Sequence, residues 1–573
     1  MKKRVIIALV LVGIICIVLA APVVIIRYKN SPPDSQIFIN GRIYTMDKQN
    51  SIVEAVAVKK DKIIAAGTTA EIRKLATAKS KIIDLQGRTM IPGLVDAHSH
   101  FPGSGMSAAG VVDLYPPPFG SVTSISVLLD EIKKKAAETK KGKWIVGFGY
   151  DDTFLKEKRH PDKNDLDAAS PDNPAFIMHI SGHYSVVNSA ALKELGITDA
   201  TLDAEGGKIH RKPGTREPNG ILEETARELA YKKAMHFSYT DQYAIIQKAA
   251  DEYISNGYTT VQNGKTDKMM LTGLSLISKL ELIPVRIVVW PAPQIADTFI
   301  ADTARAEKYN TDRFKIGAVK LLADGSIQAY TAYLTKPYYK PYEGNAAWRG
   351  YPRQPVQKLK ELVKRYHDAG MQIAIHANGD AAIDDVLDAF ESAQKANPKR
   401  DIRHLLVHGN ATRPDQLDRM KKISVSPTFL EMHPFFWGDR HKTIFLGPVR
   451  AEQVSPAGTA YKKGILFSIH LDSPVVPVVP FVLIHTALNR ETLSGAVLGL
   501  DEKIPVMEAL RAITINAAWQ MNLEDKVGSI EKGKFADFII VSDDPLANPS
   551  KIREIKVLNT IIGGVLVYNK NDR

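Results

Sequence analysis

The first part of the chain is strongly apolar. Residues 5–26 contain no charged side chain and follow a positive cluster of Lys2, Lys3 and Arg4. At ~1.5 Å per helical residue this stretch is long enough to cross a hydrocarbon core of ~30 Å. We therefore predict that residues 1–34 form a transmembrane anchor or a signal segment cleaved near Ala20–Ala21, followed by a linker. Either segment would place the body outside the cytoplasm, on the periplasmic side or at the cell surface.

Short alternating patterns follow at 36–88 and return at 537–565, near the other end of the chain. Such patterns, separated by turn residues, are typical of β-strands. The similarity of the two ends predicts one small β domain, a β-sandwich, built from residues 35–89 and 524–573. A larger domain is then inserted between them.

The central residues, 90–523, alternate brief apolar runs with longer helical patterns. Repeated βα units predict a parallel sheet and an α/β fold. Ten runs are candidate strands, more than the eight of a closed barrel, so some must belong to insertions. The segment 101–240 is expected to be a long, irregular insertion that forms a lid or substrate loops. The ten runs are Met90–Val95, Trp144–Phe148, Ala175–Ile180, Tyr258–Gln262, Pro284–Trp290, Phe314–Leu321, Gln372–His376, Arg403–His408, Ile423–Pro427 and Ile465–Ile469.

Composition narrows the chemistry. The net charge of +12 comes from scattered Lys and Arg side chains, which favours a generally basic surface over a nucleic-acid site. The single cysteine, Cys16, lies in the apolar N-terminal run. A metal in the body must therefore be held by histidine, carboxylate or modified lysine.

Several potential ligands stand at the ends of apolar runs. His98 and His100 are two residues apart after such a run, so on an extended chain both imidazoles point the same way. Each histidine alone could be an ordinary surface or core residue, but the pair favours metal binding. The same position is occupied by Lys320, His376, His408 and Asp472, and active sites of βα barrels are assembled at these strand ends.

Five sequence stretches together resemble the amidohydrolase superfamily, in its amidohydrolase 3 branch of YtcJ-like proteins and N-substituted formamide deformylases. The resemblance covers about 37–567 and implies a distorted (β/α)8 TIM barrel with a β domain made from both ends. The stretches are 93–100 (GLVDAHSH), 182–189 (GHYSVVNS), 319–326 (VKLLADGS), 375–380 (IHANGD) and 528–537 (GSIEKGKFAD).

The resemblance also implies the site. It makes His98, His100, His376 and His408 ligands of a divalent metal, most simply one or two zinc ions. Lys320 would be carboxylated and bridge two ions, with a buried or salt-bridged lysine as the alternative. Asp472 matches the catalytic aspartate and a metal ligand. The glycine-rich stretch 528–537 belongs to the β domain and is assigned no catalysis.

The roles of His470 and His183 remain open. The family usually has Ser-Asp-x-Pro where this chain has His470-Leu471-Asp472-Ser473-Pro474, so His470 is either an added pocket residue or a structural one. His183 matches a position that faces the substrate in the family, so it is a candidate catalytic residue. The alternative is a histidine packed within a loop.

The predicted function is hydrolysis of a C–N bond in a small molecule, such as an amide, formamide or N-acyl compound. Metal-activated water would attack while Asp472 transfers the proton. A deaminase is the enzymatic alternative, although deaminases of the superfamily tend to place glutamate where Asp380 follows His376. A membrane-anchored binding protein that has lost catalysis is the other alternative. The sequence leaves open whether the chain forms a homodimer.

Overall fold

The computed structural model describes residues 32–572. The predicted anchor or signal segment at 5–26 therefore lies outside the described residues. Among the described residues, helices are too short or too polar to span a bilayer. These residues form two compact units. Unit 1 contains the residues up to Ala97, Tyr253–Gly317 and those from Val506 onward, and unit 2 contains His98–Glu252 and Ala318–Pro505.

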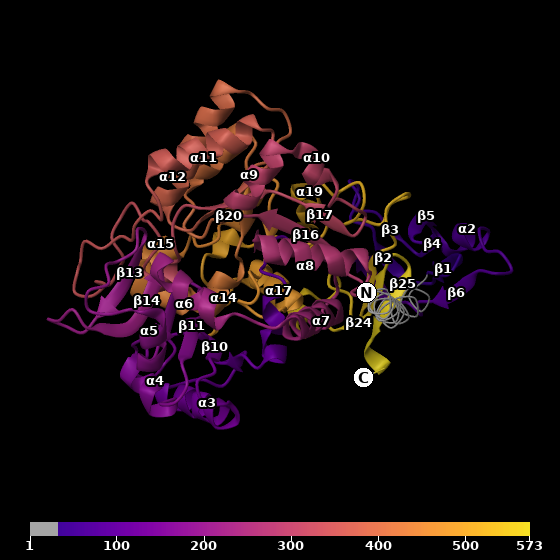
Figure 1. Ribbon diagram of the computed structural model, residues 1–573. Coiled ribbons are helices and arrows are strands. Elements are labelled where there is room, and N and C mark those ends of the chain that lie inside the picture. The colour runs from indigo at the N-terminus through magenta and orange to yellow at the C-terminus, as the bar shows by residue number, and fades with distance from the viewer. Residues whose placement is uncertain (1–31, 573) are drawn as a thin grey trace, which may run out of the picture. The chain divides into compact units, whose positions relative to one another are not determined.

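Unit 1 holds two sheets built from the ends of the chain (Figure 1). One has the order β5-β4-β1-β6, and the other has the order β25-β24-β23-β7-β2-β3. Alternate residues such as Phe38, Val56 and Phe538 bury their side chains in one apolar cluster, as strand periodicity requires. The strands are β1 Ser35–Ile39, β2 Arg42–Tyr44, β3 Ile52–Val53, β4 Ala55–Lys59, β5 Lys62–Gly67, β6 Lys81–Asp84, β7 Thr89–Pro92, β23 Phe538–Val541, β24 Val557–Ile562 and β25 Val565–Asn569.

A third sheet of unit 1 is parallel, with the order β17-β16-β15-β8. Its strands are β8 Leu94–Val95, β15 Tyr258–Thr266, β16 Arg286–Pro291 and β17 Phe314–Ile316. The predicted strand Met90–Val95 is divided at Gly93, because β7 pairs with β23 while β8 pairs with β15. A Cβ atom at Gly93 would lie 2.3 Å from Thr259 Cγ2, so only glycine fits at this division.

The residue Asp537, from the glycine-rich stretch, has a structural place in unit 1. Its carboxylate accepts hydrogen bonds from Arg286 Nε at 2.8 Å and from the Gly563 N–H at 2.7 Å. Its carbonyl accepts the Gly93 N–H at 2.9 Å. These bonds join β16, β23 and the division between β7 and β8, in agreement with a non-catalytic role.

Unit 2 contains a five-stranded parallel sheet, β18-β19-β20-β21-β22. Its strands are β18 Val319–Leu322, β19 Ile373–Ala377, β20 Leu405–His408, β21 Ser426–Phe429 and β22 Ser468–Ile469. In the register, Leu322 pairs with His376 and Ala377 pairs with His408. The carboxyl ends of these strands therefore lie along one edge, which brings residues distant in sequence to one place.

The segment predicted as an irregular insertion is instead an ordered sheet, and that prediction is wrong. Its order is β13-β14-β12-β11-β10-β9, and two of the ten candidate strands, Trp144–Phe148 and Ala175–Ile180, correspond to β10 and β11 within it. Its strands β10, β11 and β12 are buried at every position, so they lack a clear polar alternation. The bounds are β9 Val112–Asp113, β10 Ile145–Tyr150, β11 Ala175–His179, β12 Tyr184–Val187, β13 Gly207–Arg211 and β14 Pro218–Glu224.

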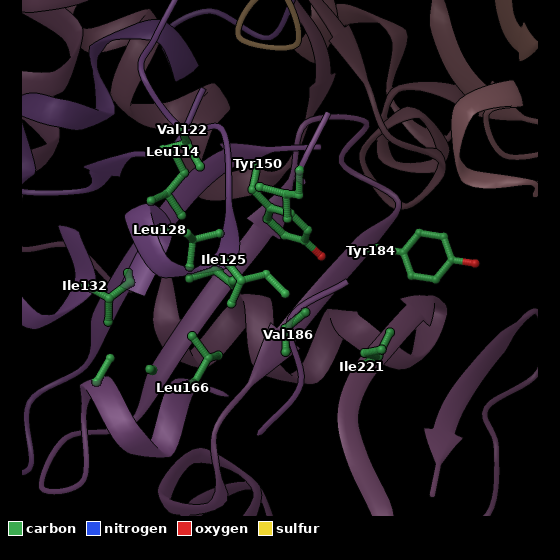
Figure 2. Packing of buried hydrophobic residues seen from close by; sticks show 14 of the residues in the cluster. Leu114, Val122, Ile125, Leu128, Ile132, Tyr150, Leu166, Tyr184, Val186 and Ile221 are labelled. Atoms are coloured by element: carbon green, nitrogen blue, oxygen red, sulfur yellow. The ribbon is translucent and has the colours of Figure 1, made fainter. Parts of the chain in front are cut away.

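Helices cover both faces of this sheet (Figure 1). On one face, Ile125, Leu128 and Ile132 of helix α3 (Ile125–Glu138) pack near Leu166 of α4 (Lys163–Ala169) and Tyr150 of β10 (Figure 2). The spacing of the three α3 residues places them on one helical face. On the other face, alternate strand residues pack against α5 (Ser189–Leu195) and α6 (Glu228–Ala234). The sheet is therefore a rigid, doubly covered support for the residues at its edges.

The helices of the described residues are α2 Thr69–Arg73, α3 Ile125–Glu138, α4 Lys163–Ala169, α5 Ser189–Leu195, α6 Glu228–Ala234, α7 Tyr239–Ser255, α8 Lys268–Lys279, α9 Pro293–Ala301, α10 Thr303–Glu307, α11 Val356–Asp368, α12 Asp380–Ala396, α13 Pro414–Ile423, α14 Met432–Arg440, α15 Gly447–Ala451, α16 Ala457–Lys462, α17 Pro480–Asn489, α18 Val506–Ala512 and α19 Ile515–Gln520. Short 3-10 turns are η1 Gly103–Ala109, η2 Thr225–Arg227, η3 Ile327–Ala329, η5 Leu500–Glu502, η6 Pro549–Glu554 and η7 Lys570–Asp572, and η4 His441–Phe445 is a π-helical turn.

Candidate metal centre

All six residues predicted to bind metal lie in unit 2. Lys320 is within β18, His376 is within β19, and His408 is the last residue of β20. Asp472 follows β22 by three residues, with a positive φ of 56°. His98 and His100 begin the first segment of the unit.

His98, His100 and Asp472 form the first part of the centre. The Asp472 Oδ1 atom is 3.6 Å from His98 Nε2 and 3.3 Å from His100 Nε2. One ligand atom from each of the three residues lies within 4.8 Å of the other two. His98 is fully buried, whereas the His100 side chain is 40% exposed. The cluster therefore has one side that small molecules can reach.

Backbone hydrogen bonds hold this cluster in place. The Asp472 N–H donates to the His98 carbonyl at 3.2 Å, and the His100 N–H donates to the Ser473 carbonyl at 2.7 Å. The Ser473 N–H donates to Ser99 Oγ at 3.1 Å. The two ligand-bearing loops are thus joined as a short ladder, so their side chains are positioned before any ligand binds.

Lys320, His376 and His408 form the second part. The Lys320 Nζ atom lies 2.9 Å from His98 Nε2 and connects the two parts. The rings of His376 and His408 have centroids 4.5 Å apart, and those of His98 and His408 are 5.3 Å apart. Burial lowers the pKa values of His376 and His408 well below the ordinary value. Both imidazoles are therefore neutral near pH 7, which is the form that binds metal.

Hydrogen bonds to one ring nitrogen leave the other available. His376 Nε2 lies 2.9 Å from the Gly325 carbonyl and 3.1 Å from Asn378 Nδ2, so these contacts engage Nε2 and leave Nδ1 as the nitrogen for a metal. His408 Nδ1 lies 3.0 Å from His470 Nε2, and His470 Nδ1 lies 2.9 Å from Thr428 Oγ1. Such outer bonds orient metal-binding histidines.

The arrangement around His470 favours its structural alternative. The residue is 1% exposed, and burial lowers its pKa to about 3. Because both ring nitrogens are already hydrogen-bonded, His470 orients His408 rather than offering a free nitrogen to a substrate.

His183 lies beside the second part of the centre. Its ring centroid is 5.4 Å from that of His376, and its Nδ1 atom is 2.7 Å from Glu224 Oε1. Arg353 Nη1 pairs with the other oxygen of Glu224 at 2.5 Å. Burial raises the pKa of Glu224, but its hydrogen bond and electrostatic interaction with His183, together with the Arg353 guanidinium, outweigh burial and lower the pKa to about 2. Glu224 is therefore an ionised carboxylate that fixes the His183 ring.

Sequence reasoning did not single out Glu224, Arg353 or Asp324. Asp324 follows β18 and accepts the N–H groups of Tyr333, Asn378 and Gly379 at 2.8–3.0 Å. Burial raises its pKa to about 8. The sequence held a signal for Asp324, because Asp324 and its partners Asn378 and Gly379 lie in the recognised stretches 319–326 and 375–380. Glu224 and Arg353 belong to none of the recognised stretches.

The residues of the centre fit a metal ion. The Asp472 Oδ1 atom is buried and has no hydrogen-bond partner within residues 32–572, although it lies between two imidazole nitrogens. A buried carboxylate oxygen left without a partner is costly, and a cation would satisfy it. Imidazole and carboxylate donors suit zinc and related divalent ions. Parallel strands with histidine and carboxylate side chains at their carboxyl ends are the arrangement of a metal-binding α/β enzyme.

Comparison with known proteins identifies the family. The sequence model of the amidohydrolase family matches residues 81–568, and the chain belongs to this family. It is 28% identical over 547 residues to N-substituted formamide deformylase of Arthrobacter pascens, covering 93% of this chain and 98% of the relative. It is also 28% identical to YtcJ of Bacillus subtilis (strain 168), covering 93% and 99% of the two chains.

A solved structure supports the same conclusion. An uncharacterised metal-dependent hydrolase from Pyrococcus horikoshii OT3 superposes with a TM-score of 0.71 at 26% identity, covering 89% of this chain and 98% of that chain. The protein is thus a hydrolase of a metal-dependent amidohydrolase family.

Proposed function

We propose that this protein hydrolyses a C–N bond in a small amide, formamide or other N-acyl compound. The observation that carries the proposal is the unpartnered, buried Asp472 Oδ1 beside the Nε2 atoms of His98 and His100. The relative from Arthrobacter pascens is described as acting on N-substituted formamides, which makes formamides the first compounds to test.

His98, His100, Lys320, His376, His408 and Asp472 would hold one or two divalent ions, with zinc as our candidate and carboxylation of Lys320 required for a bridge. When bound, the metal supplies water activation and polarisation of the scissile carbonyl. Asp472 takes the proton from the attacking water at its carboxylate and passes it to the departing nitrogen. Its pKa supports this role, because His100 and neighbouring positive charge lower it despite the raising effect of burial.

His183 is proposed to hold the substrate carbonyl. With Nδ1 fixed by Glu224, Nε2 is the ring nitrogen left for the substrate, and it would donate to the carbonyl in the imidazolium form of His183. A positioned donor that meets the charge developing on a carbonyl oxygen lowers the barrier to acyl transfer. The positions of Glu224 and Arg353 make His183 a rigid group rather than a loosely packed loop histidine.

The deaminase alternative is less well supported. Asp380, which stands where deaminases of the superfamily tend to place glutamate, accepts the Thr335 N–H at 2.8 Å and pairs with Arg413 at 3.3 Å. Both carboxylate oxygens therefore have structural partners. The inactive binding protein is disfavoured because the described residues retain every predicted ligand within one unit.

The location is part of the proposal. The apolar stretch at 5–26, preceded by basic residues, supports export of the body and its retention at a membrane. Protease added to intact cells should degrade the body if it is outside the cytoplasm, and protection of the body until lysis would contradict this part.

The decisive test compares Asp472→Asn with the native full chain. Metal per chain is measured by elemental analysis, and turnover is measured on a panel of N-formyl and N-acyl amines. We expect the variant to keep most of its metal while turnover falls by at least ~10³-fold. Equal turnover would eliminate Asp472 as the proton acceptor, and release of ammonia from nucleobase-like compounds instead would favour the deaminase.

A further inference from the structure

A second group of metal-type ligands lies in the six-stranded sheet of unit 2. Asp151 and Asp152 follow β10 directly, and His179 is the last residue of β11. These strands are parallel, and Tyr150 pairs with His179 in the register. The carboxyl ends of both strands therefore place the three side chains together, at the kind of sheet edge where ligands bind in α/β proteins. None of them belongs to the centre described above.

The geometry of this group is that of a chelating site. His179 Nε2 is 3.2 Å from Asp152 Oδ1 and 4.0 Å from Asp151 Oδ1. The three ligand atoms lie within 4.8 Å of one another. His160 approaches the same carboxylate, with its Nε2 atom 3.9 Å from Asp152 Oδ1.

The remaining atoms of these side chains are fixed by neighbours. Asp151 Oδ1 accepts the Thr153 N–H at 2.9 Å, and Asp151 Oδ2 accepts Trp437 Nε1 at 2.8 Å. His179 Nδ1 lies 2.8 Å from Ser181 Oγ. Bonds of this kind orient ligands toward a metal in known centres. They leave His179 Nε2 facing the carboxylates.

The independent sign of a missing partner is His179 Nε2 itself. The side chain is completely buried, and this nitrogen makes no hydrogen bond to any residue in 32–572. Its distance to Asp152 allows electrostatic attraction, but the direction does not satisfy a hydrogen bond. His179 Nδ1 accepts the Ser181 N–H at 3.2 Å, and a bound cation would take Nε2 in the tautomer in which Nδ1–H donates to Ser181 Oγ.

The charge of the group also favours a cation. Asp151 is fully buried, and the Asp152 side chain is 17% exposed. The neighbouring Arg440 guanidinium interacts with both carboxylates and balances only one of them. Two acidic side chains beside one guanidinium form an acidic group in a buried place, which is unfavourable unless it is compensated.

We propose that Asp151, Asp152 and His179 bind an additional divalent metal ion of the zinc class, with His160 as a further ligand. The ion would join the carboxyl ends of β10 and β11 and would be distinct from the one or two ions of the catalytic centre. Two carboxylates and one or two imidazoles form a mixed N/O donor set suited to zinc.

The test counts Zn²⁺ ions in the metal-stripped full chain by calorimetric titration. The variants are Asp152→Asn and His179→Gln, and the matched control is Asp172→Asn, whose exposed carboxylate precedes β11 and pairs with Lys141 at 2.8 Å. We expect either site variant to bind one ion fewer per chain, or to bind that ion at least ~10-fold more weakly. The control should match the native chain. Unchanged zinc binding in both site variants would overturn the proposal.

A second measurement leaves Asp151, Asp152 and His179 unchanged. His98→Asn combined with His100→Asn should weaken the catalytic centre and still leave one tightly bound Zn²⁺ per chain. Absence of that ion would show that His179 and Asp152 form only an ion pair, and would overturn the proposal. Turnover is scored separately in the native chain, so failure of the proposed hydrolysis and failure of this site give different results.

Discussion

At the scale of single residues, the centre depends on which ring nitrogen of each histidine is already engaged. His376 Nε2 contacts the Gly325 carbonyl, and His408 Nδ1 contacts His470 Nε2. The remaining nitrogen of each ring is therefore the one that a metal can use. The metal ligands recognised from the sequence therefore depend on hydrogen-bond partners that the fold brings to them. These partners need not belong to the same sequence motif.

The bond between His470 and His408 leads to the first prediction. His470→Leu removes the partner of His408 Nδ1, so the ring loses its fixed orientation. We expect zinc affinity or turnover to fall by ~10–100-fold, the usual effect of removing such a partner. The measurement is a zinc titration with parallel kinetics. Thr428→Ser keeps the hydroxyl that contacts His470 and serves as the control. A change in substrate preference without a change in zinc affinity would instead make His470 a pocket residue.

The pair between His183 and Glu224 leads to a prediction about pH. The folded-state pKa of Glu224 is about 2, below its ordinary value of 4.5, so its ionised form stabilises the native state. That contribution is fully present above pH 4.5 and is lost as the pH falls toward 2, and it amounts to about 3 kcal/mol from the size of the shift. The stability difference between the native chain and Glu224→Gln should therefore shrink on acidification below pH 4.5, as measured by urea unfolding. A difference that stays constant down to pH 3 would contradict this assignment.

At the scale of elements, a fully buried ion pair joins α14 to α17. Arg490 follows α17 and donates to Glu431, the residue before α14, at 2.6 Å. Its other donors reach the Leu498 and Ser455 carbonyls at 3.0 and 3.1 Å. Both side chains are 0% exposed. One guanidinium thus holds two helices and two loops of unit 2.

Arg490→Met should destabilise the protein by about 3–5 kcal/mol, because it leaves Glu431 buried without its partner. The measurement is the shift of the unfolding transition in urea. Adding Glu431→Leu removes the unpaired charge and should restore a large part of the loss. If the double variant is as unstable as Arg490→Met alone, the loss comes from the carbonyl contacts of Arg490 and not from the stranded carboxylate.

The elements also show how far the sequence could predict the fold. Apolar runs before His376 and His408 correctly marked β19 and β20, because buried parallel strands are continuous apolar stretches. The split at Gly93 was missed, since it depends on the contact with Thr259, far along the chain. Within 101–240, β10 and β11 were predicted as strands, whereas the other four strands of their sheet were missed. In the site, strand-end ligands could be predicted, whereas Glu224 reaches His183 only through the pairing of β12 with β14.

At the scale of the whole molecule, the predicted ligands connect two distant parts of one unit. His98 and His100 belong to the segment that ends at Glu252, and the other four belong to the segment that begins at Ala318. A metal bound by both segments would restrict the unfolded chain as a cross-link does, and long closed loops give the larger entropic effect. The domain boundaries at 35–89 and 524–573 remain a prediction. Because the predicted ligands all lie in unit 2, comparing the two units can locate the effect of the metal on stability.

Removal of the metal should therefore destabilise unit 2 selectively. Binding to the native state adds stability that rises with metal concentration relative to the dissociation constant, about 4 kcal/mol at a thousandfold excess. After chelation, we expect faster hydrogen–deuterium exchange in peptides from β18 to β22, where the ligands stand. Peptides from β1, β4 and β23 contain no predicted ligand and should keep their protection, which makes them an internal control. Restored zinc should reverse the change. Equal loss of protection in both sets of peptides would mean that the metal supports folding of the entire chain. No loss in either set would show that the metal has no structural role, and its catalytic role would then be judged by turnover.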